Sequence, residues 1–401
     1  MTKSLKNLLC LLFVVSLSFA LLLFGGCSKT TVASLIDDAE SGDTIVFDED
    51  MTNEDDIVID KELVFDLNQK IITTTKTFVI KQNGKLTIKN GRLSANSDID
   101  CIIKNEGTLV VDGAVIKANK NSLCIKNQKD FVFKNGTIIG KNAVDNSGVF
   151  EMQNGTMNGD EFEYSIINRN KATINGGVIG EERLTVYNTI YHTSGIKSNG
   201  ELTVNGGISG SISVDGANAK GYFFGGKIEG VECMNAYVEF ENKNNLVCGG
   251  STPLNNFGTA VIKSGKFTSI YDEGYADNGA MVINHGTLTI YDGDICHMSV
   301  GASANLTIYG GTFADVQAYG NLTVCGGTFN DVLLTRSTSN VKLQGGTFKK
   351  GAEIEVVQSD FAQNILTLQN LLAQGYMFDA DEQIDTTLDK TTLEFSVVAQ
   401  N

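Results

Sequence analysis

The stretch Asn305-Leu-Thr-Ile-Tyr-Gly-Gly-Thr-Phe313 decides the fold, because close copies follow as Asn321-Leu-Thr-Val-Cys-Gly-Gly-Thr-Phe329 and Asn340-Val-Lys-Leu-Gln-Gly-Gly-Thr-Phe348. Each copy contains two alternating apolar residues, a glycine two or three places on, and another apolar residue. Aligned on this glycine, twelve copies follow one another, mostly 16 to 23 residues apart. The anchor glycines are Gly91, Gly113, Gly136, Gly155, Gly177, Gly207, Gly226, Gly265, Gly293, Gly311, Gly327 and Gly346.

The residues around each anchor glycine predict two short strands joined by a corner. Three places before the glycine every copy is apolar, and two places after it every copy except Ser209 is apolar. Period-two alternation broken by a glycine indicates a strand, a bend and a second strand. One such coil cannot bury its own apolar face, so coils must stack into a solenoid with parallel sheets. The prediction is an all-β, single-stranded parallel β-helix.

The first coils carry a family resemblance. The run Ser34-Leu-Ile-Asp-Asp-Ala-Glu-Ser-Gly-Asp-Thr-Ile-Val-Phe47 and the strand that starts at Ile57 resemble the start of right-handed parallel β-helix proteins of the pectate-lyase-like superfamily. The resemblance covers roughly residues 31–350. It implies right-handed coils and a short helix that caps the first coil. It leaves function open, because this fold hosts lyases, hydrolases, adhesins and spacers.

Residues 1–26 are predicted to be a targeting segment. Lys3 and Lys6 precede the apolar run from Leu8 to Phe24, and Gly-Gly-Cys27 follows. This arrangement resembles a bacterial lipoprotein signal, which implies that Cys27 is acylated and becomes the new N-terminus. The alternatives are an ordinary signal peptide, with secretion, or an uncleaved anchor. Each interpretation places the rest of the chain outside the cytoplasm, and the first anchors it to a bacterial membrane.

The remaining chain is interpreted as a solenoid over residues 27–350 and an α/β cap over residues 351–401. In the cap, Ser359-Asp360 is expected to begin a helix that runs to about Gln374, and a strand is expected over residues 391–398. Such a cap would cover the open sheet edge of the last coil.

The charge of the chain argues against two classes of partner. Loss of the two lysines in residues 1–26 takes the net charge from −16 to −18. A surface this acidic disfavours binding to nucleic acid or to anionic membranes. Contact with the membrane is therefore expected through the N-terminal lipid only.

Two cysteines are expected to lie on adjacent coils. Cys101 and Cys124 each stand 12 residues before their anchor glycine. Stacking would bring their Cα atoms within disulfide range. The alternative is a pair of free thiols packed as small apolar side chains.

One outward register gathers the candidate catalytic and metal-ligating residues. Four places after the glycine, consecutive coils carry His297, Asp315, Asp331 and Lys350. Coils in step would place Asp315 and Asp331 about 5 Å apart, as a low-affinity Ca²⁺ site or a carboxylate pair. The alternative is a solvated face with screened charges, which would leave the chain with no catalytic residues, metal or cofactor.

The long intervals between anchors hold the candidate glycan contacts, because insertions in solenoids gather on one face and often bind. Aromatic rings beside carboxylates suit sugars. The candidates are Tyr187, Tyr191, His192, Tyr271 and Tyr275.

These patterns favour a non-enzymatic, adhesin-like lipoprotein at the bacterial cell surface, whose rod contacts an extracellular glycan or a host or bacterial surface. The alternative is a divergent polysaccharide lyase or glycoside hydrolase. The second reading needs acids and a base that converge on one face, and the line from His297 to Lys350 is the one such set in the aligned register.

Overall fold

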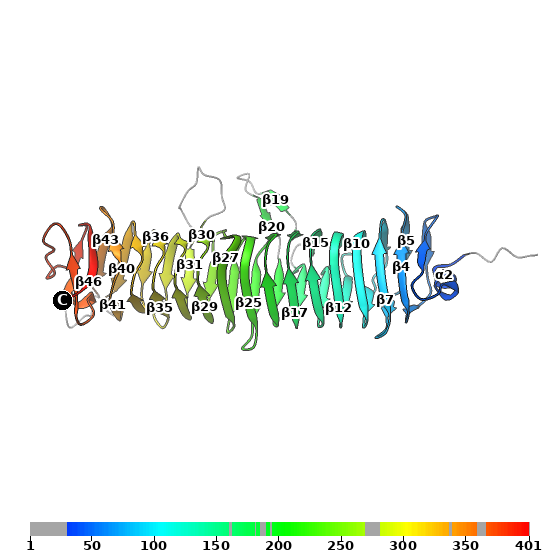
Figure 1. Ribbon diagram of the computed structural model, residues 1–401, viewed down its shortest axis with the longest axis horizontal. Helices are drawn as coiled ribbons and strands as arrows, with labels where there is room; N and C mark the ends of the chain where they lie inside the picture. The colour runs from blue at the N-terminus through cyan, green and yellow to red at the C-terminus, as the bar shows by residue number, and fades with distance from the viewer. Residues whose placement is uncertain are drawn as a thin grey trace, which may run out of the picture.

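The computed structural model describes residues 30–159, 163–180, 182–184, 190–192, 195–268, 281–336, 339–358 and 366–400. These residues form a parallel β-solenoid of about 13 turns. Figure 1 shows a straight rod, with helix α2 (Val32–Asp38) at one end and the C-terminal strands at the other. The predicted all-β parallel solenoid is therefore confirmed.

Each coil has three faces, and the strand before the anchor glycine forms the first. These strands pair in parallel with those of the neighbouring coils. In β10, β12, β25 and β27 the strand continues through the corner into the second face. The first-face strands are β1 (Thr44–Val46), β4 (Glu62–Asp66), β7 (Lys85–Lys89), β10 (Thr108–Lys117), β12 (Asp130–Ile139), β14 (Val149–Met152), β17 (Lys171–Ile174), β22 (Glu201–Val204), β25 (Lys220–Ile228), β27 (Tyr237–Cys248), β29 (Thr259–Ile262), β32 (Thr287–Ile290), β35 (Asn305–Ile308), β38 (Asn321–Val324) and β41 (Val341–Leu343).

The second face follows the glycine corner and belongs to the same 28-stranded sheet. Gly311 and Gly327 have φ angles of 103° and 98° there. Glycine adopts this left-handed backbone without the steric cost that a Cβ would add. The second-face strands are β2 (Met51–Asn53), β5 (Ile71–Thr74), β8 (Arg92–Ala95), β15 (Thr156–Asn158), β18 (Val178–Ile179), β23 (Ile208–Ser209), β30 (Lys266–Phe267), β33 (Asp294–Ile295), β36 (Thr312–Phe313), β39 (Thr328–Phe329) and β42 (Thr347–Phe348).

The third face is a separate 16-stranded sheet. Its strands lie between the second face of one coil and the first face of the next. They are β3 (Ile57–Ile59), β6 (Phe78–Ile80), β9 (Cys101–Asn105), β11 (Leu123–Asn127), β13 (Val144–Asn146), β16 (Ile166–Asn168), β21 (Ile196–Ser198), β24 (Ile212–Asp215), β26 (Val231–Met234), β28 (Leu254–Asn256), β31 (Met281–Asn284), β34 (His297–Val300), β37 (Val316–Ala318), β40 (Val332–Arg336), β43 (Glu353–Val357) and β45 (Lys390–Thr391).

The core is a set of apolar ladders that run along the rod. Phe313, Phe329 and Phe348 are fully buried, and their ring centroids are 5.2 and 4.6 Å apart. Stacked coils place equivalent side chains one above another, so each inward position repeats its contact from coil to coil. Ser209, the one polar residue in this register, is also buried. The inward positions are thus those that the alignment predicts, with one exception.

The exception is the coil of Gly113. Gly136 pairs with Ala114 rather than with Gly113, because a bulge shifts the register between Val111 and Ala114. Val111 and Ile116 are the buried residues of this coil, one place later than the alignment predicts. A bulge adds one residue to one strand and turns the following side chains to the other face.

At the N-terminal end, α2 begins after Thr31, whose side chain accepts a hydrogen bond from the Ser34 amide. Its residues Val32 and Ile36 are buried in the core that the first coils form. None of the described helices is long and apolar enough to cross a membrane.

The C-terminal end differs from the predicted helix and strand. The described helix α3 covers only Leu368–Leu371, and the expected start at Ser359-Asp360 lies outside the described residues. The parallel sheet continues beyond residue 350 into β43. Strand β46 (Phe395–Ala399) then pairs in antiparallel fashion with β42 and with β44 (Tyr376–Asp379). The expected strand over residues 391–398 is split between β45 and β46.

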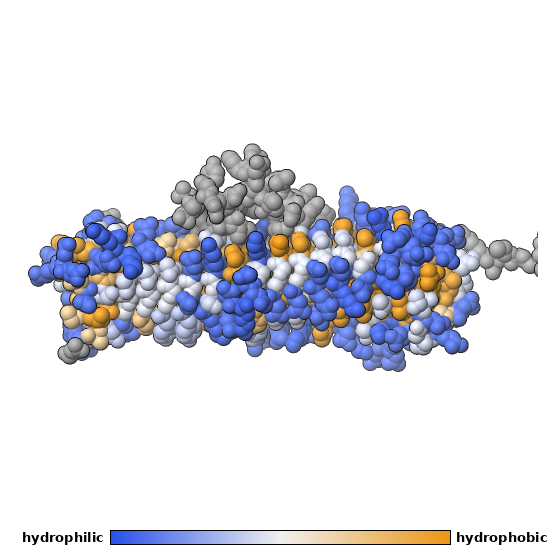
Figure 2. Space-filling view, turned by 45° about the horizontal axis from the view of Figure 1, so that its top comes forward, coloured by the Kyte–Doolittle hydropathy of each residue, from blue (hydrophilic) through white to orange (hydrophobic). Residues whose placement is uncertain are grey.

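The surface of the rod is mostly hydrophilic. Figure 2 shows polar side chains over most of the visible face, with apolar side chains in small separate groups and a pale band of intermediate hydropathy. A hairpin of β19 (Glu182–Leu184) and β20 (Ile190–His192) stands out from one side of the rod in Figure 1.

Candidate functional site: the corners of the solenoid

The corner between the third face and the next first face contains a ladder of buried asparagines. Asn105, Asn127, Asn146 and Asn168 are each 0% exposed. They occupy the last position of β9, β11, β13 and β16, which pair in register. The ladder ends at Ser198 in β21. These residues were not among the sequence candidates, although Asn-x-Gly at residues 105–107 and 146–148 is a readable turn signal.

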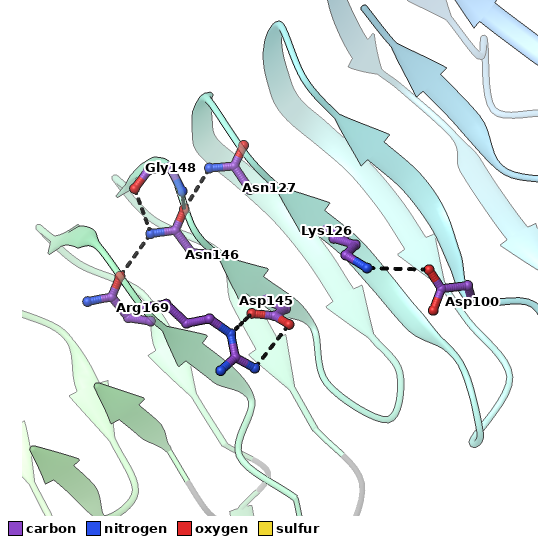
Figure 3. Close-up of polar contacts among 8 residues, drawn as sticks. Asp100, Lys126, Asn127, Asp145, Asn146, Gly148 and Arg169 are labelled. Carbon is purple, nitrogen blue, oxygen red and sulfur yellow. Dashed lines mark hydrogen bonds and ion pairs between the residues drawn. The ribbon is translucent and has the colours of Figure 1, made fainter. Parts of the chain in front are cut away.

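Side-chain amides connect the ladder from coil to coil. The Nδ2 atom of each asparagine donates to the next side chain along the rod, at 2.7 Å from Asn105 to Asn127 and from Asn127 to Asn146, 2.8 Å from Asn146 to Asn168, and 2.9 Å from Asn168 to Ser198. Figure 3 shows Asn146 between Asn127 and the backbone of Gly148. The amides also satisfy the turn backbone, so the corner is rigid and buries few unpaired polar atoms.

The ladder is interrupted in the middle of the rod. Val214 and Cys233 occupy the next two register positions after Ser198. The asparagines resume at Asn256, which donates to Asn284 at 2.8 Å. The corners in this gap differ in length. Four residues separate Asp215 from Lys220, whereas Asn235 and Ala236 alone separate Met234 from Tyr237.

The structure brings two residues of the predicted outward line together. The Nδ1 atom of His297 lies 2.6 Å from an Oδ atom of Asp315, and both side chains are about one-fifth exposed. The other Asp315 carboxylate oxygen accepts a hydrogen bond from the amide of Val332 at 3.3 Å. A carboxylate that holds an imidazole in this way can orient it as a base.

The other two residues of that line are out of step. Phe313 pairs with Phe329, but Val316 pairs with Leu333, so the later corner contains one additional residue. Asp315 therefore lies beside Val332 rather than beside Asp331. The next corner is longer again, because Leu333 pairs with Ile354, which displaces Lys350. The expected stacked carboxylate pair is not formed. Within the described ranges, no group of three or more His, Cys, Asp or Glu residues could hold a metal ion.

Cys101 and Cys124 are free thiols. Cys101 pairs with Leu123, because the bulge at Gly113 makes the interval between these coils 22 residues rather than 23. The Cys124 thiol donates to the carbonyl of Ile139 at 2.9 Å. The predicted stack of the two cysteines is therefore wrong, and the alternative of buried thiols describes the structure.

The predicted glycan contacts fall in regions that the structure does not describe. Tyr187, Tyr271 and Tyr275 lie outside the described residues. Tyr191 and His192 belong to β20, for which the backbone alone is described. Cys27 also lies outside the described residues.

Other aromatic residues gather on the described surface and were not among the candidates. Tyr291 and Tyr309 follow the first-face strands of two consecutive coils and are 51% and 50% exposed. Their rings stack with centroids 5.1 Å apart and 10° between planes. At the ladder corner, Phe257 is 42% exposed and stacks on His285 at 4.6 Å. The signal is present in the sequence, as aromatic residues at outward positions beside the anchor and ladder registers.

A polar triad lies next to these rings on the first face. The hydroxyl of Tyr237 donates to Glu239 at 2.7 Å, and the Lys263 ammonium lies 2.6 Å from the same carboxylate. Burial raises the pKa of Tyr237, and the bond to Glu239 raises it further, so its hydroxyl stays protonated. Desolvation acts to raise the pKa of Glu239, but the bonds from Lys263 and Tyr237 outweigh it and lower that pKa. The Tyr237 ring is thereby fixed in place.

Searches against protein-family models, curated proteins and solved structures gave no match, so the function rests on the site itself.

Proposed function

We propose that this chain is a non-enzymatic lipoprotein, tethered at the cell surface through Cys27, whose rod contacts extracellular glycans. The observation that carries the glycan contact is the exposed, ordered pair Tyr291 and Tyr309, each about half exposed. Large apolar side chains rarely stand in the solvent in register without a partner. Tyrosine combines an apolar ring with a polar hydroxyl, which suits the mixed surface of a sugar.

The rigidity of the rod supports this proposal. Stacked coils hold the rings at fixed spacing, so little side-chain freedom is lost when a ligand binds. The surface charge favours neutral glycans, because an acidic chain would be repelled by a protein of net charge −16.

A glycan array probed with residues 28–401 tests the proposal. We expect binding to neutral glycans that weakens in the double variant Tyr291→Ala/Tyr309→Ala. The matched control is Val149→Ala, which removes an exposed aliphatic side chain from β14. Absence of binding to every glycan would refute the contact. A control variant that loses as much binding as the double variant would deny the tyrosines their role.

The tether is tested separately on the full chain. We expect radiolabelled palmitate to be incorporated into the protein in bacterial cells and incorporation to be lost in Cys27→Ala. Labelling that persists in this variant would contradict acylation at Cys27.

A second candidate function is polysaccharide cleavage, and the contact between His297 and Asp315 is the observation that favours it. Reducing-sugar and unsaturated-product assays on acidic and neutral polysaccharides distinguish the two functions. The binding proposal expects no product. Product that forms with the wild type and disappears in His297→Ala would establish the enzyme instead.

A further inference from the structure

A slot one coil wide opens where the asparagine ladder is interrupted. It is lined by residues of three successive coils, among them Ala217, Asn235, Tyr237, Phe257 and Thr259, and its volume is about 430 Å³. Such a volume falls in the range of about 300–1,000 Å³ that is typical of small-molecule sites.

The slot exists because three neighbouring corners have different shapes. The turn that contains Ala217 holds four residues between paired strand positions, and it forms one wall. The next corner is short, and Asn235 with φ of 53° and Ala236 form the floor. The Phe257 corner forms the second wall. Coils stack at about 4.8 Å, so the two walls stand about two coil spacings apart, which leaves room for one ring at van der Waals distance from each wall.

The Phe257 ring presents one free face to this slot. Its other face is covered by His285 of the following coil, with 19° between the ring planes. The uncovered face therefore points back along the rod, towards the coil of Asn235. Because the side chain is 42% exposed, a ligand in the slot would cover apolar surface that the fold leaves in water.

Polar groups surround the free ring. Tyr237 keeps its hydroxyl bonded to Glu239, and Thr259 is exposed at the start of β29. The side chain of Asn235 is exposed above the floor. A ligand with one apolar ring face and a rim of hydroxyl groups matches this arrangement, because the aromatic face attracts the C–H groups and the polar rim accepts and donates hydrogen bonds.

We infer that this slot binds a single neutral pyranose ring of a glycan, with its C–H face against Phe257 and its hydroxyl groups towards Asn235 and Thr259. This inference rests on the proposed function, since it names the subsite at which the rod takes one sugar unit. It differs from the Tyr291–Tyr309 pair, whose rings stack on each other and show mainly their edges.

Two variants and a control test the slot. The probes are the methyl β-glycosides of glucose, galactose, mannose and N-acetylglucosamine, titrated into residues 28–401 and followed by saturation-transfer NMR and by the amide shifts of Asn235 and Gly258. Phe257→Ala removes the wall and should weaken binding about tenfold. Ala217→Trp leaves the ring in place but fills the slot, and should abolish binding. Tyr309→Ala, at the other corner, should leave these titrations unchanged.

The outcomes separate the two proposals. Amide shifts at Asn235 and Gly258 that vanish in both slot variants support the subsite. If the wild type binds glycans and neither Phe257→Ala nor Ala217→Trp changes the titrations, the slot is refuted and the glycan-contacting function stands. If no glycan binds the wild type, the slot and the function fail together.

Discussion

The coils from Asn105 to Ser198 and the coils around Val214 and Cys233 have the same inward ladders but different corners. In the first region a hydrogen-bonded amide from each coil fixes the corner, and the turns are uniform. In the second the amide is replaced by a valine and a thiol, and corner lengths vary from coil to coil. The comparison teaches that the apolar core specifies the rod, whereas the polar corner ladder specifies a smooth edge. Where the ladder stops, the edge can become concave.

The largest expected effect is at the centre of the ladder. Asn146→Leu removes the acceptor of Asn127 and the donor to Asn168, both fully buried. An unpaired buried polar group costs about 1–3 kcal/mol, so the two losses should lower the free energy of unfolding by about 2–6 kcal/mol. Urea denaturation followed by circular dichroism measures this. A loss below 1 kcal/mol would show that the ladder is not what stabilises these corners.

The buried thiol of the ladder region gives a pH-dependent effect of intermediate size. Desolvation raises the pKa of Cys124 from its usual 9.0 to about 12. The unfolded chain therefore releases this proton above pH 9 while the folded chain retains it, and stability falls as pH rises from 9 towards 12. The expected slope for one group is up to about 1.4 kcal/mol per pH unit.

Urea midpoints of the wild type and Cys124→Ala between pH 8 and 11 isolate this slope, because other groups titrate in both proteins. The variant should lose less stability over this range. Equal slopes in the two proteins would mean that the Cys124 thiol does not hold its proton in the folded state.

The interruption of the ladder should tolerate a change that the ladder does not. The Cys233 thiol donates to the carbonyl of Ala236 at 3.3 Å, and a serine hydroxyl can make the same bond. Cys233→Ser should therefore cost about 1 kcal/mol or less, since no neighbouring side-chain amide loses a partner. Asn146→Ser is the matched comparison and should cost clearly more. Equal losses in thermal unfolding would erase the difference between the two regions.

The smallest effect is expected on the outer surface of the ladder region. Arg169 pairs with Asp145 at 2.8 Å, but its side chain is 51% exposed. Solvent and salt screen such a pair, so Arg169→Ala should change the free energy of unfolding by about 0–1 kcal/mol. Figure 3 shows this pair beside the asparagines. A loss as large as that of Asn146→Leu would place the stabilisation on the surface rather than at the buried corner.

The alignment predicted the rod because its signal is local and repeats. Ile308 and Phe313 are inward in the structure as in the alignment, and the same rule holds in each aligned coil except that of Gly113. That coil fails because a bulge is set by the pairing of two strands, which a single strand does not show. The same one-residue error produced the wrong cysteine stack.

The candidate site was less predictable. The approach of His297 to Asp315 follows from equal corner lengths, but Asp331 is displaced by one additional corner residue that the anchor alignment does not count. The exposed rings of Tyr291 and Phe257 were readable in the sequence, but whether a ring faces solvent or a neighbour depends on the next coil. The asparagine ladder also had a signal, in the Asn-x-Gly turns, which the search for catalytic residues passed over.

The sequence by itself determined the solenoid, its three-residue inward pattern and the glycine corners, because these depend on side-chain alternation and on backbone freedom within one coil. The tertiary structure alone decided the register between coils, the free thiols, the continuous amide ladder and the slot at its interruption. Each of those depends on how neighbouring corners differ in length, and the residues that meet there, such as Ala217 and Phe257, are about two coils apart along the chain.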